Sequence, residues 1–241
     1  LTVVLMNPGV TDALSGRLSF YKQDGTALPV SIEGQVVTYR DITLPHSGTV
    51  YLSAGPAGPG LVSGWAIFEL VDDGSGNWGG HHGSGGAMDH SNYDHVFGTL
   101  IYEFAPGDAT QTQVGVLGSR YEMGYFMGFS LPVSVGTTVN TGIALVNTGT
   151  LTQNVALRLI SSAGALTSET TLVLPPGGQN AFYVSDAFPG VDFTQFRGSV
   201  EVRNQYEGIV ALGLLQIDGI LTSIPVVHIP DSMPGWGSGG P

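Results

Sequence analysis

Hydrophobic and polar residues alternate along many short segments of the chain. Examples are LSFY, GTVYL, GWAIFEL and TLIYEF in the first half, and NVALRLI, GSVEV and IVALGLLQI in the second half. A period of two predicts β-strands with one face buried. Turn-forming residues interrupt the pattern about every 8 to 12 residues, a spacing typical of antiparallel sandwiches and barrels. One short helical turn is expected at residues 185–190, and the pattern otherwise predicts an all-β fold.

The predicted strands of the first half recur in the same order in the second half. Residues 2–9 match residues 142–149, because both are an alternating strand followed by an Asn-x-Gly turn. Four further segments match in order: 18–20 with 157–159, 42–45 with 172–175, 64–68 with 198–202, and 96–99 with 209–212. The offset between partners changes only between strands, where insertions are tolerated. Five matches in one order predict a single fold used twice.

This repeat predicts the domain organisation. We expect two tandem antiparallel β-sandwich domains, residues 1–130 and 131–230, followed by a Gly/Pro-rich C-terminal tail, residues 231–241. The tail is expected to be a linker or an extension docked on a neighbour. Between the fourth and fifth matches the offset falls from 134 to 113, so the first domain carries a hairpin insertion of about 21 residues within residues 72–94.

The second half contains the segments TGIALVN, LVLPPGGQNAFYV, FPG, FRGSVEV and IVALGLL. In these segments it resembles the immunoglobulin-like repeats of large secreted and cell-surface bacterial proteins. The resemblance covers nearly all of the second domain and most of the first outside the insertion. It implies tandem Ig-like β-sandwiches, which act as spacers, adhesins or filament building blocks. It brings no catalytic residues, and the insertion departs from its pattern.

Charge and cysteine content narrow the function classes. Only 11% of the residues are charged, the net charge is -12, and Lys22 is the single lysine. A polyanion would be repelled, which argues against nucleic acid as a partner and against binding to anionic lipid. The chain has no cysteine and no apolar stretch long enough to insert into a membrane. Because it begins at Leu1 inside a predicted strand, we expect a processed or excised segment. A charge-poor surface favours an extracellular or cell-surface location.

The insertion gathers residues that can ligate a transition metal. Imidazole suits Zn, Cu and Ni, and an added methionine favours Cu. A glycine-rich backbone can turn tightly enough to bring ligands that are close in sequence together. The candidate metal ligands are His81, His82, Met88, Asp89, His90, Asp94 and His95.

Two other interpretations of the insertion stay open. It can be a solvated polar loop, or it can pack against a neighbouring subunit with His81 and His82 as hydrogen-bonding contacts. The spacing of the ligands matches no closed zinc motif. Residues 72–77 place oxygen ligands at alternating positions, but they lack the distal glutamate of a calcium loop, so a polar turn is expected there.

Catalytic motifs are missing from the sequence. It has no Gly-x-Ser-x-Gly segment, His46 sits in a turn, and His228 lies in an apolar strand. The aromatic run Tyr121–Phe129 is expected to pack between the modules or on the next subunit, with a carbohydrate-stacking platform as the alternative. Trp65 is expected in the sandwich core. We therefore expect a protein without enzymatic activity.

Two function classes fit these observations. The first is a structural or assembly protein, a subunit of a surface filament, pilus-like fibre or secreted scaffold. Its partners would be further copies of the chain or other surface proteins, linked by β-strand addition. The second is a surface binding module, either an adhesin for glycan or a protein that captures Cu, Zn or Ni through the histidine-rich loop.

Overall fold

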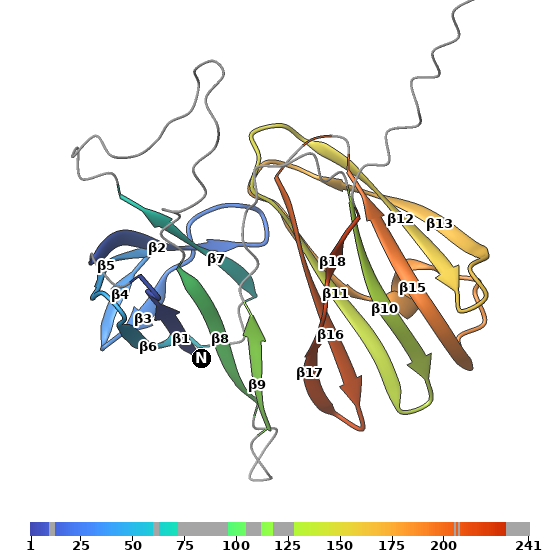
Figure 1. Ribbon diagram of the computed structural model, residues 1–241, viewed down its shortest axis with the longest axis horizontal. Helices are drawn as coiled ribbons and strands as arrows, with labels where there is room; N and C mark the ends of the chain where they lie inside the picture. Colours follow the sequence, from blue (N-terminus) through green and yellow to red (C-terminus); the bar gives the residue numbers. More distant parts are fainter. Residues whose placement is uncertain are drawn as a thin grey trace, which may run out of the picture. The chain divides into compact units, whose positions relative to one another are not determined.

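The computed structural model describes residues 1–9, 13–59, 63–71, 96–104, 112–117, 128–204, 206 and 208–229. Within these residues the regular secondary structure is almost wholly β-strand, and the pairings among β1 to β8 and among β10 to β18 are antiparallel. The predicted all-β fold is confirmed. The chain divides into two compact units, one chiefly N-terminal and one chiefly C-terminal (Figure 1).

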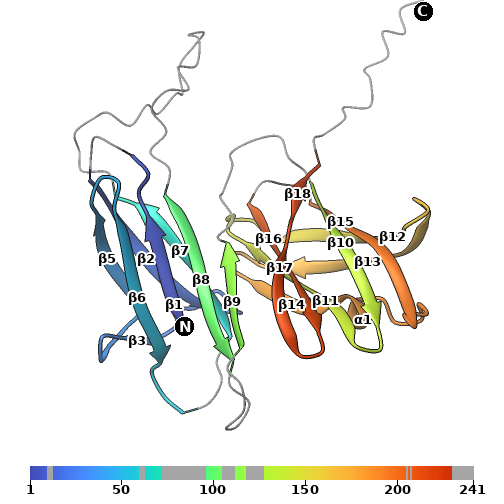
Figure 2. The ribbon, with the colours of Figure 1, turned by 60° about the horizontal axis from the view of Figure 1, so that its bottom comes forward.

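The first unit consists of two antiparallel sheets (Figure 2). Its strands are β1 (Thr2–Met6), β2 (Leu14–Lys22), β3 (Val30–Ile32), β4 (Gln35–Val37), β5 (Tyr39–Leu44), β6 (Thr49–Pro56), β7 (Gly64–Leu70), β8 (Phe97–Phe104) and β9 (Thr112–Leu117). One sheet has the order β4-β3-β6-β1-β8-β9 and the other the order β5-β2-β7. Leu5, Leu18 and Leu44 belong to one buried cluster, to which both sheets contribute. The two sheets therefore pack on each other as in a β-sandwich.

The second unit also has two sheets. Its strands are β10 (Gly128–Gly136), β11 (Val139–Asn147), β12 (Gln153–Ser161), β13 (Leu166–Leu174), β14 (Gln179–Tyr183), β15 (Gln195–Arg203), β16 (Ile209–Ile217), β17 (Ile220–Ile224) and β18 (Val227–His228). The sheet orders are β14-β11-β16-β17 and β13-β12-β15-β10-β18. The core cluster draws Leu145 from the first of these sheets, and Leu157 and Val200 from the second. All three side chains are fully buried.

A single turn of helix, α1 (Val184–Ala187), follows β14. It begins one residue before the helical turn expected at 185–190 and ends ahead of Pro189. Val184 is fully buried and Phe188, directly after the helix, is 2% exposed. These two side chains fix the turn on the core of the second unit. No helix among the described residues has the length and apolar character needed to span a membrane.

The two units share one strand order. The strands β6-β1-β8-β9 correspond to β14-β11-β16-β17, and β5-β2-β7 correspond to β13-β12-β15. The registers agree as well, because Leu18 lies opposite Phe68 in the first unit and Leu157 lies opposite Val202 in the second. Two features differ: the first unit adds the β3–β4 hairpin next to β6, and the second adds β10 and β18 next to β15.

Several sequence predictions fall at or beyond the limits of the described residues. The insertion at residues 72–94 and the tail at 231–241 lie outside them. The expected domain boundary at residue 130 falls within β10, which pairs with β15 along its whole length. The domain limits stay a prediction.

Trp65 is not in the sandwich core, contrary to the prediction. Ala66 and Phe68 of β7 pack against the core of the first unit. Because side chains of a strand alternate between its two faces, Trp65 points to the opposite side of the sheet. There its ring stacks on that of Tyr21, with centroids 4.5 Å apart.

Candidate functional site

The predicted metal ligands cannot be placed. All seven lie outside the described residues: His81, His82, Met88, Asp89, His90, Asp94 and His95. Within the part of the chain that the structure describes, no group of three or more His, Asp or Glu side chains could hold a metal ion. His46 is exposed in its turn, and the ring of His228 lies 5.0 Å from that of Phe129. The histidine-rich site therefore stays a prediction.

The outer face of the β5-β2-β7 sheet carries a compact polar and aromatic cluster. Arg17 of β2 lies opposite Asp41 of β5, and its Nε and Nη2 atoms donate hydrogen bonds of 2.7 and 3.2 Å to the two carboxylate oxygens. The Arg17 guanidinium also lies over the ring of Tyr39, 4.1 Å from its centroid. Such a cation–π contact and a two-point ion pair orient a guanidinium firmly.

The ion pair shifts both of its pKa values in the direction that keeps both groups charged. The hydrogen bond from Arg17 holds the pKa of Asp41 below its usual range, and the bond to Asp41 raises the pKa of Arg17. These shifts make Asp41 a weaker proton acceptor and Arg17 a weaker proton donor than the free groups. The cluster suits binding and is poorly suited to acid–base catalysis.

A shallow, open depression adjoins this cluster. Its volume is about 570 Å³, and it is lined by Pro29 and by residues 36–41. Two of the lining side chains, Val36 and Tyr39, are 63% and 47% exposed. An exposed aromatic ring beside fixed polar groups can stack on a sugar ring or an apolar ligand.

The strand β7 forms the border of this sheet within the described residues. Its inward side chains Ala66, Phe68 and Leu70 are only half-buried. In the second unit the corresponding strand β15 is followed by β10, and Val200 and Val202 are fully buried. The sheet edge of the first unit therefore leaves apolar side chains less covered than the second unit does.

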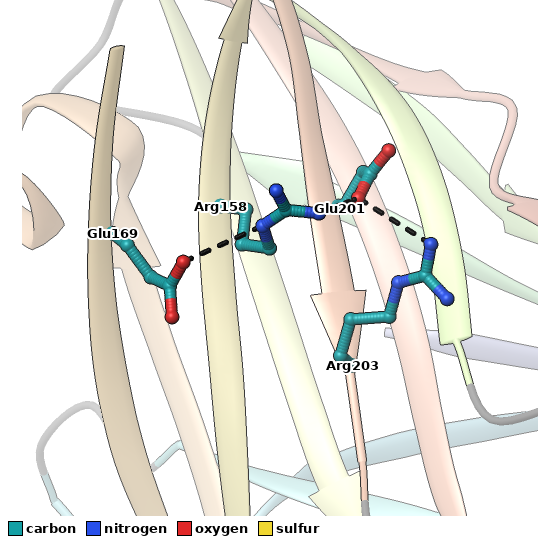
Figure 3. A network of polar contacts seen from close by, with 4 residues as sticks. All are labelled: Arg158, Glu169, Glu201 and Arg203. Carbon is teal, nitrogen blue, oxygen red and sulfur yellow. Dashed lines mark hydrogen bonds and ion pairs between the residues drawn. The ribbon is translucent and has the colours of Figure 1, made fainter. Parts of the chain in front are cut away.

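A charged network crosses the outer face of the second unit's five-stranded sheet (Figure 3). Arg158 on β12 lies between two acids, 3.4 Å from Glu169 on β13 and 3.0 Å from Glu201 on β15. Arg203 approaches Glu201 at 3.5 Å. Glu201 is the most buried member, with its side chain 24% exposed. Partly exposed ion pairs of this kind each contribute about 1 kcal/mol or less to the free energy of unfolding. The network therefore stabilises the pairing of these strands only modestly.

The opposite sheet of the second unit has a different outer surface. The strands β11, β14, β16 and β17 contain no charged residue. Ile143 and Ala211 are buried, so the alternate residues Ala144, Val146 and Leu212 face outward. Solvent-facing sides of antiparallel sheets are ordinarily polar, whereas these three outward side chains are apolar and half-buried.

These surfaces were not evident in the sequence. Arg17 and Asp41 are 24 residues apart in the sequence, and no motif around either residue indicates that they pair. One signal was present: in GWAIFEL, apolar residues point to both faces, which is typical of a strand enclosed on both sides.

We searched for similar proteins among family models, curated proteins and solved structures, and none of the three comparisons found a match.

Proposed function

We propose that this chain is a non-enzymatic, extracellular assembly protein, built from two tandem immunoglobulin-like β-sandwiches and forming part of a surface filament, pilus-like fibre or secreted scaffold. The observation that best supports this proposal is the charge-free outer face of the β14-β11-β16-β17 sheet. A face without acids lets copies of a chain with net charge -12 approach without strong local repulsion.

The equivalence of the two units supports the tandem part of the proposal. Each of the five sequence matches agrees with a strand pairing. In the first unit Leu5 lies opposite Val50, and in the second unit Leu145 lies opposite Asn180. Leu145 comes 140 residues after Leu5 and Asn180 comes 130 residues after Val50, and these are the offsets between the matched sequence segments. Independent folds would have no reason to share both strand order and register.

Association at the charge-free face can be tested by sedimentation velocity over a range of protein concentrations. Leu212→Glu places a charge on this face, and Thr171→Glu places one on the exposed outer side of β13 as a matched control. We expect the wild type and the Thr171 variant to associate with rising concentration and the Leu212 variant to stay monomeric. A wild-type protein that is monomeric at every concentration would contradict the proposal.

A second candidate function is a surface binding module for glycan. The observation that favours it is the Tyr39 ring, held by Arg17 beside the open depression. A glycan array with the wild type, Tyr39→Ala and Tyr51→Ala tests this candidate. Tyr51 is 69% exposed on β6 and serves as the control for a general loss of surface aromatics. Loss of glycan binding in Tyr39→Ala but not in Tyr51→Ala supports the glycan-binding module. Equal binding signals from the wild type and both variants would contradict it.

A further inference from the structure

We propose that the depression beside Tyr39 binds uncharged saccharides that present two neighbouring hydroxyl groups, and that Asp41 is the residue that selects them. The sugar ring would stack on Tyr39, and its hydroxyls would donate hydrogen bonds to the Asp41 carboxylate. This inference rests on the second candidate function, a surface binding module for glycan, for which it names the class of ligand.

The β-sandwich fold does not need the ion pair between Arg17 and Asp41. Because the two units share strand order and register, the positions of this pair correspond to Ala156 and Thr171, which also lie opposite each other. The corresponding strands of the second unit therefore pair without charges at these positions. The Arg17 and Asp41 side chains are 45% and 62% exposed, and ion pairs as exposed as this add little to stability. The pair is therefore better explained by a role at the surface than by folding.

Tyr39 and Asp41 present an aromatic ring and a carboxylate on the same side of one strand. They are two residues apart on β5, so their Cα atoms are separated by about 7 Å and both side chains point to the outer face of the sheet. Arg17 lies over the Tyr39 ring, 4.1 Å from its centroid, and fixes its orientation. Tyr39 is nevertheless 47% exposed and lines the depression, so it can still contact a ligand. A sugar ring stacked on Tyr39 brings its hydroxyls towards Asp41.

The ion pair supplies a hydrogen-bond acceptor and a donor side by side. Each carboxylate oxygen of Asp41 accepts one hydrogen bond from Arg17 and has the capacity to accept another. Arg17 uses its Nε and Nη2 atoms for these bonds, which leaves Nη1 as a further donor. Two neighbouring sugar hydroxyls can each donate and accept, so they match this arrangement. Because Arg17 already orients the carboxylate, little side-chain entropy is lost when a ligand binds.

The charges around the depression disfavour acidic saccharides. On the outer face of the sheet, Arg17 lies opposite Asp41 on β5 and opposite Glu69 on β7. Both acids are exposed, so two negative charges flank one positive charge, in a chain with net charge -12. Arg40, which also lines the depression, is paired with Glu33 at 3.3 Å. A carboxylate or sulfate on the ligand would therefore be repelled, whereas a neutral sugar would not.

A glycan array with the full chain tests the class of ligand. The array carries neutral oligosaccharides of glucose, galactose and mannose, each beside a counterpart that contains the matching uronic acid. The neutral oligosaccharide that binds most strongly is then titrated by calorimetry, together with analogues that lack one hydroxyl at a time. These analogues leave the protein unchanged, so they test the recognition of hydroxyls without an effect on folding.

Two matched variants test the role of Asp41. Asp41→Asn keeps the shape of the side chain but removes the charge that strengthens its hydrogen bonds. Glu169→Gln is the control, because it removes the carboxylate of an Arg–Glu pair between the corresponding strands of the second unit. Tyr39→Ala removes the aromatic ring itself and shows whether a bound glycan uses this depression.

We expect neutral glycans to bind and their uronic acid counterparts to bind more weakly. Removal of either of the two neighbouring hydroxyls, or Asp41→Asn, should each weaken binding by at least about 10-fold, since a hydrogen bond to a charged group is lost. Glu169→Gln should bind as the wild type does. Stronger binding of the uronic acids, equal affinity for all the deoxy analogues, or unchanged affinity of Asp41→Asn would each overturn the inference.

The outcomes separate this inference from the function on which it rests. Glycan binding that depends on Tyr39 but not on Asp41 overturns the selection by Asp41 and leaves the glycan-binding module in place. Absence of binding to every glycan on the array overturns both the module and this inference. Self-association through the charge-free face is measured independently by sedimentation.

Discussion

Asn7 and Asn147 make two equivalent side-chain hydrogen bonds in the two units. Both are fully buried; Asn7 directly follows β1, and Asn147 is the last residue of β11. The side-chain oxygen accepts a hydrogen bond from the backbone two residues on, Gly9 at 2.9 Å and Gly149 at 3.0 Å. The side-chain nitrogen donates to a strand-end carbonyl in the other sheet, that of Leu44 or Leu174. One asparagine thus ties the two sheets of each sandwich together.

Removal of the Asn147 amide should destabilise the second unit. Asn147→Ala leaves the buried carbonyl of Leu174 and the partly buried carbonyl of Leu151 without this donor, at a cost of about 2–4 kcal/mol. Chemical denaturation followed by hydrogen exchange in β11 and β12 measures the loss. Asn154→Ala, at an exposed position of β12, is the control and should change stability by about 0.5 kcal/mol or less.

The matching change in the first unit should cost less. The bond from Asn7 to Leu44 is 3.4 Å long, against 2.9 Å for that from Asn147 to Leu174. We expect Asn7→Ala to cost about 1–2 kcal/mol, confined to the first unit. A larger loss than that of Asn147→Ala would contradict this ranking of the two asparagines.

Gly64 and Gly198 should both be intolerant of a side chain. A Cβ atom at Gly64 would lie 2.1 Å from the carbonyl oxygen of Tyr21, and one at Gly198 would lie 2.0 Å from that of Ile160. Replacing either glycine by alanine should cost about 2 kcal/mol through forced separation of the strands. Gly55→Ala is the control, because a Cβ there meets no atom within 4 Å. Thermal unfolding of the three variants checks the prediction, and equal melting temperatures would refute it.

The Arg17–Asp41 pair should give the first unit a defined pH dependence. The pKa of Asp41 in the folded protein lies below that of the unfolded chain, chiefly because Arg17 donates hydrogen bonds to it. The resulting stabilisation is therefore present above the ordinary carboxyl pKa and is lost as the pH falls through the lowered value. Carbon NMR titration should show the pKa of Asp41 rising towards normal in Arg17→Gln.

Asp192 provides an internal control for that titration. Its pKa is lowered by hydrogen bonds from the hydroxyl and the backbone amide of Thr194, in a turn of the second unit. The Arg17 replacement should leave this value unchanged. A parallel rise at both carboxyls would mean that the variant disturbs the fold as a whole.

The histidine-rich insertion yields a separate prediction. If its histidines, Met88 and the two aspartates ligate a transition metal, calorimetry should show binding of Cu, Zn or Ni that is strongest for Cu, because of the methionine. A variant without residues 78–95 is the control. Binding should weaken as the pH falls below about 6, since protonated imidazole cannot ligate a metal. Equal, negligible heats in both proteins would remove the metal site.

The sequence alone determined the all-β class and the matched segments, which recur in the same order along the chain. Alternation with a period of two is a local property of each strand, and the Asn-x-Gly turn after residue 6 and after residue 146 is equally local. Tertiary structure decided which face of each strand is enclosed. Trp65 lies in a segment whose two faces are both apolar. The alternation of hydrophobic and polar residues therefore could not predict whether the Trp65 side chain lies in the core or on the outer surface.

The partners of the surface residues likewise depended on the three-dimensional fold. Arg17 meets Asp41 only because β2 and β5 pair in one particular register, which is set by the packing of Leu18 and Leu44 into the core. The border position of β7 has the same origin. A strand's own residues fix its alternation, but its neighbours are fixed by contacts between segments far apart in the chain, and these carry no local signature.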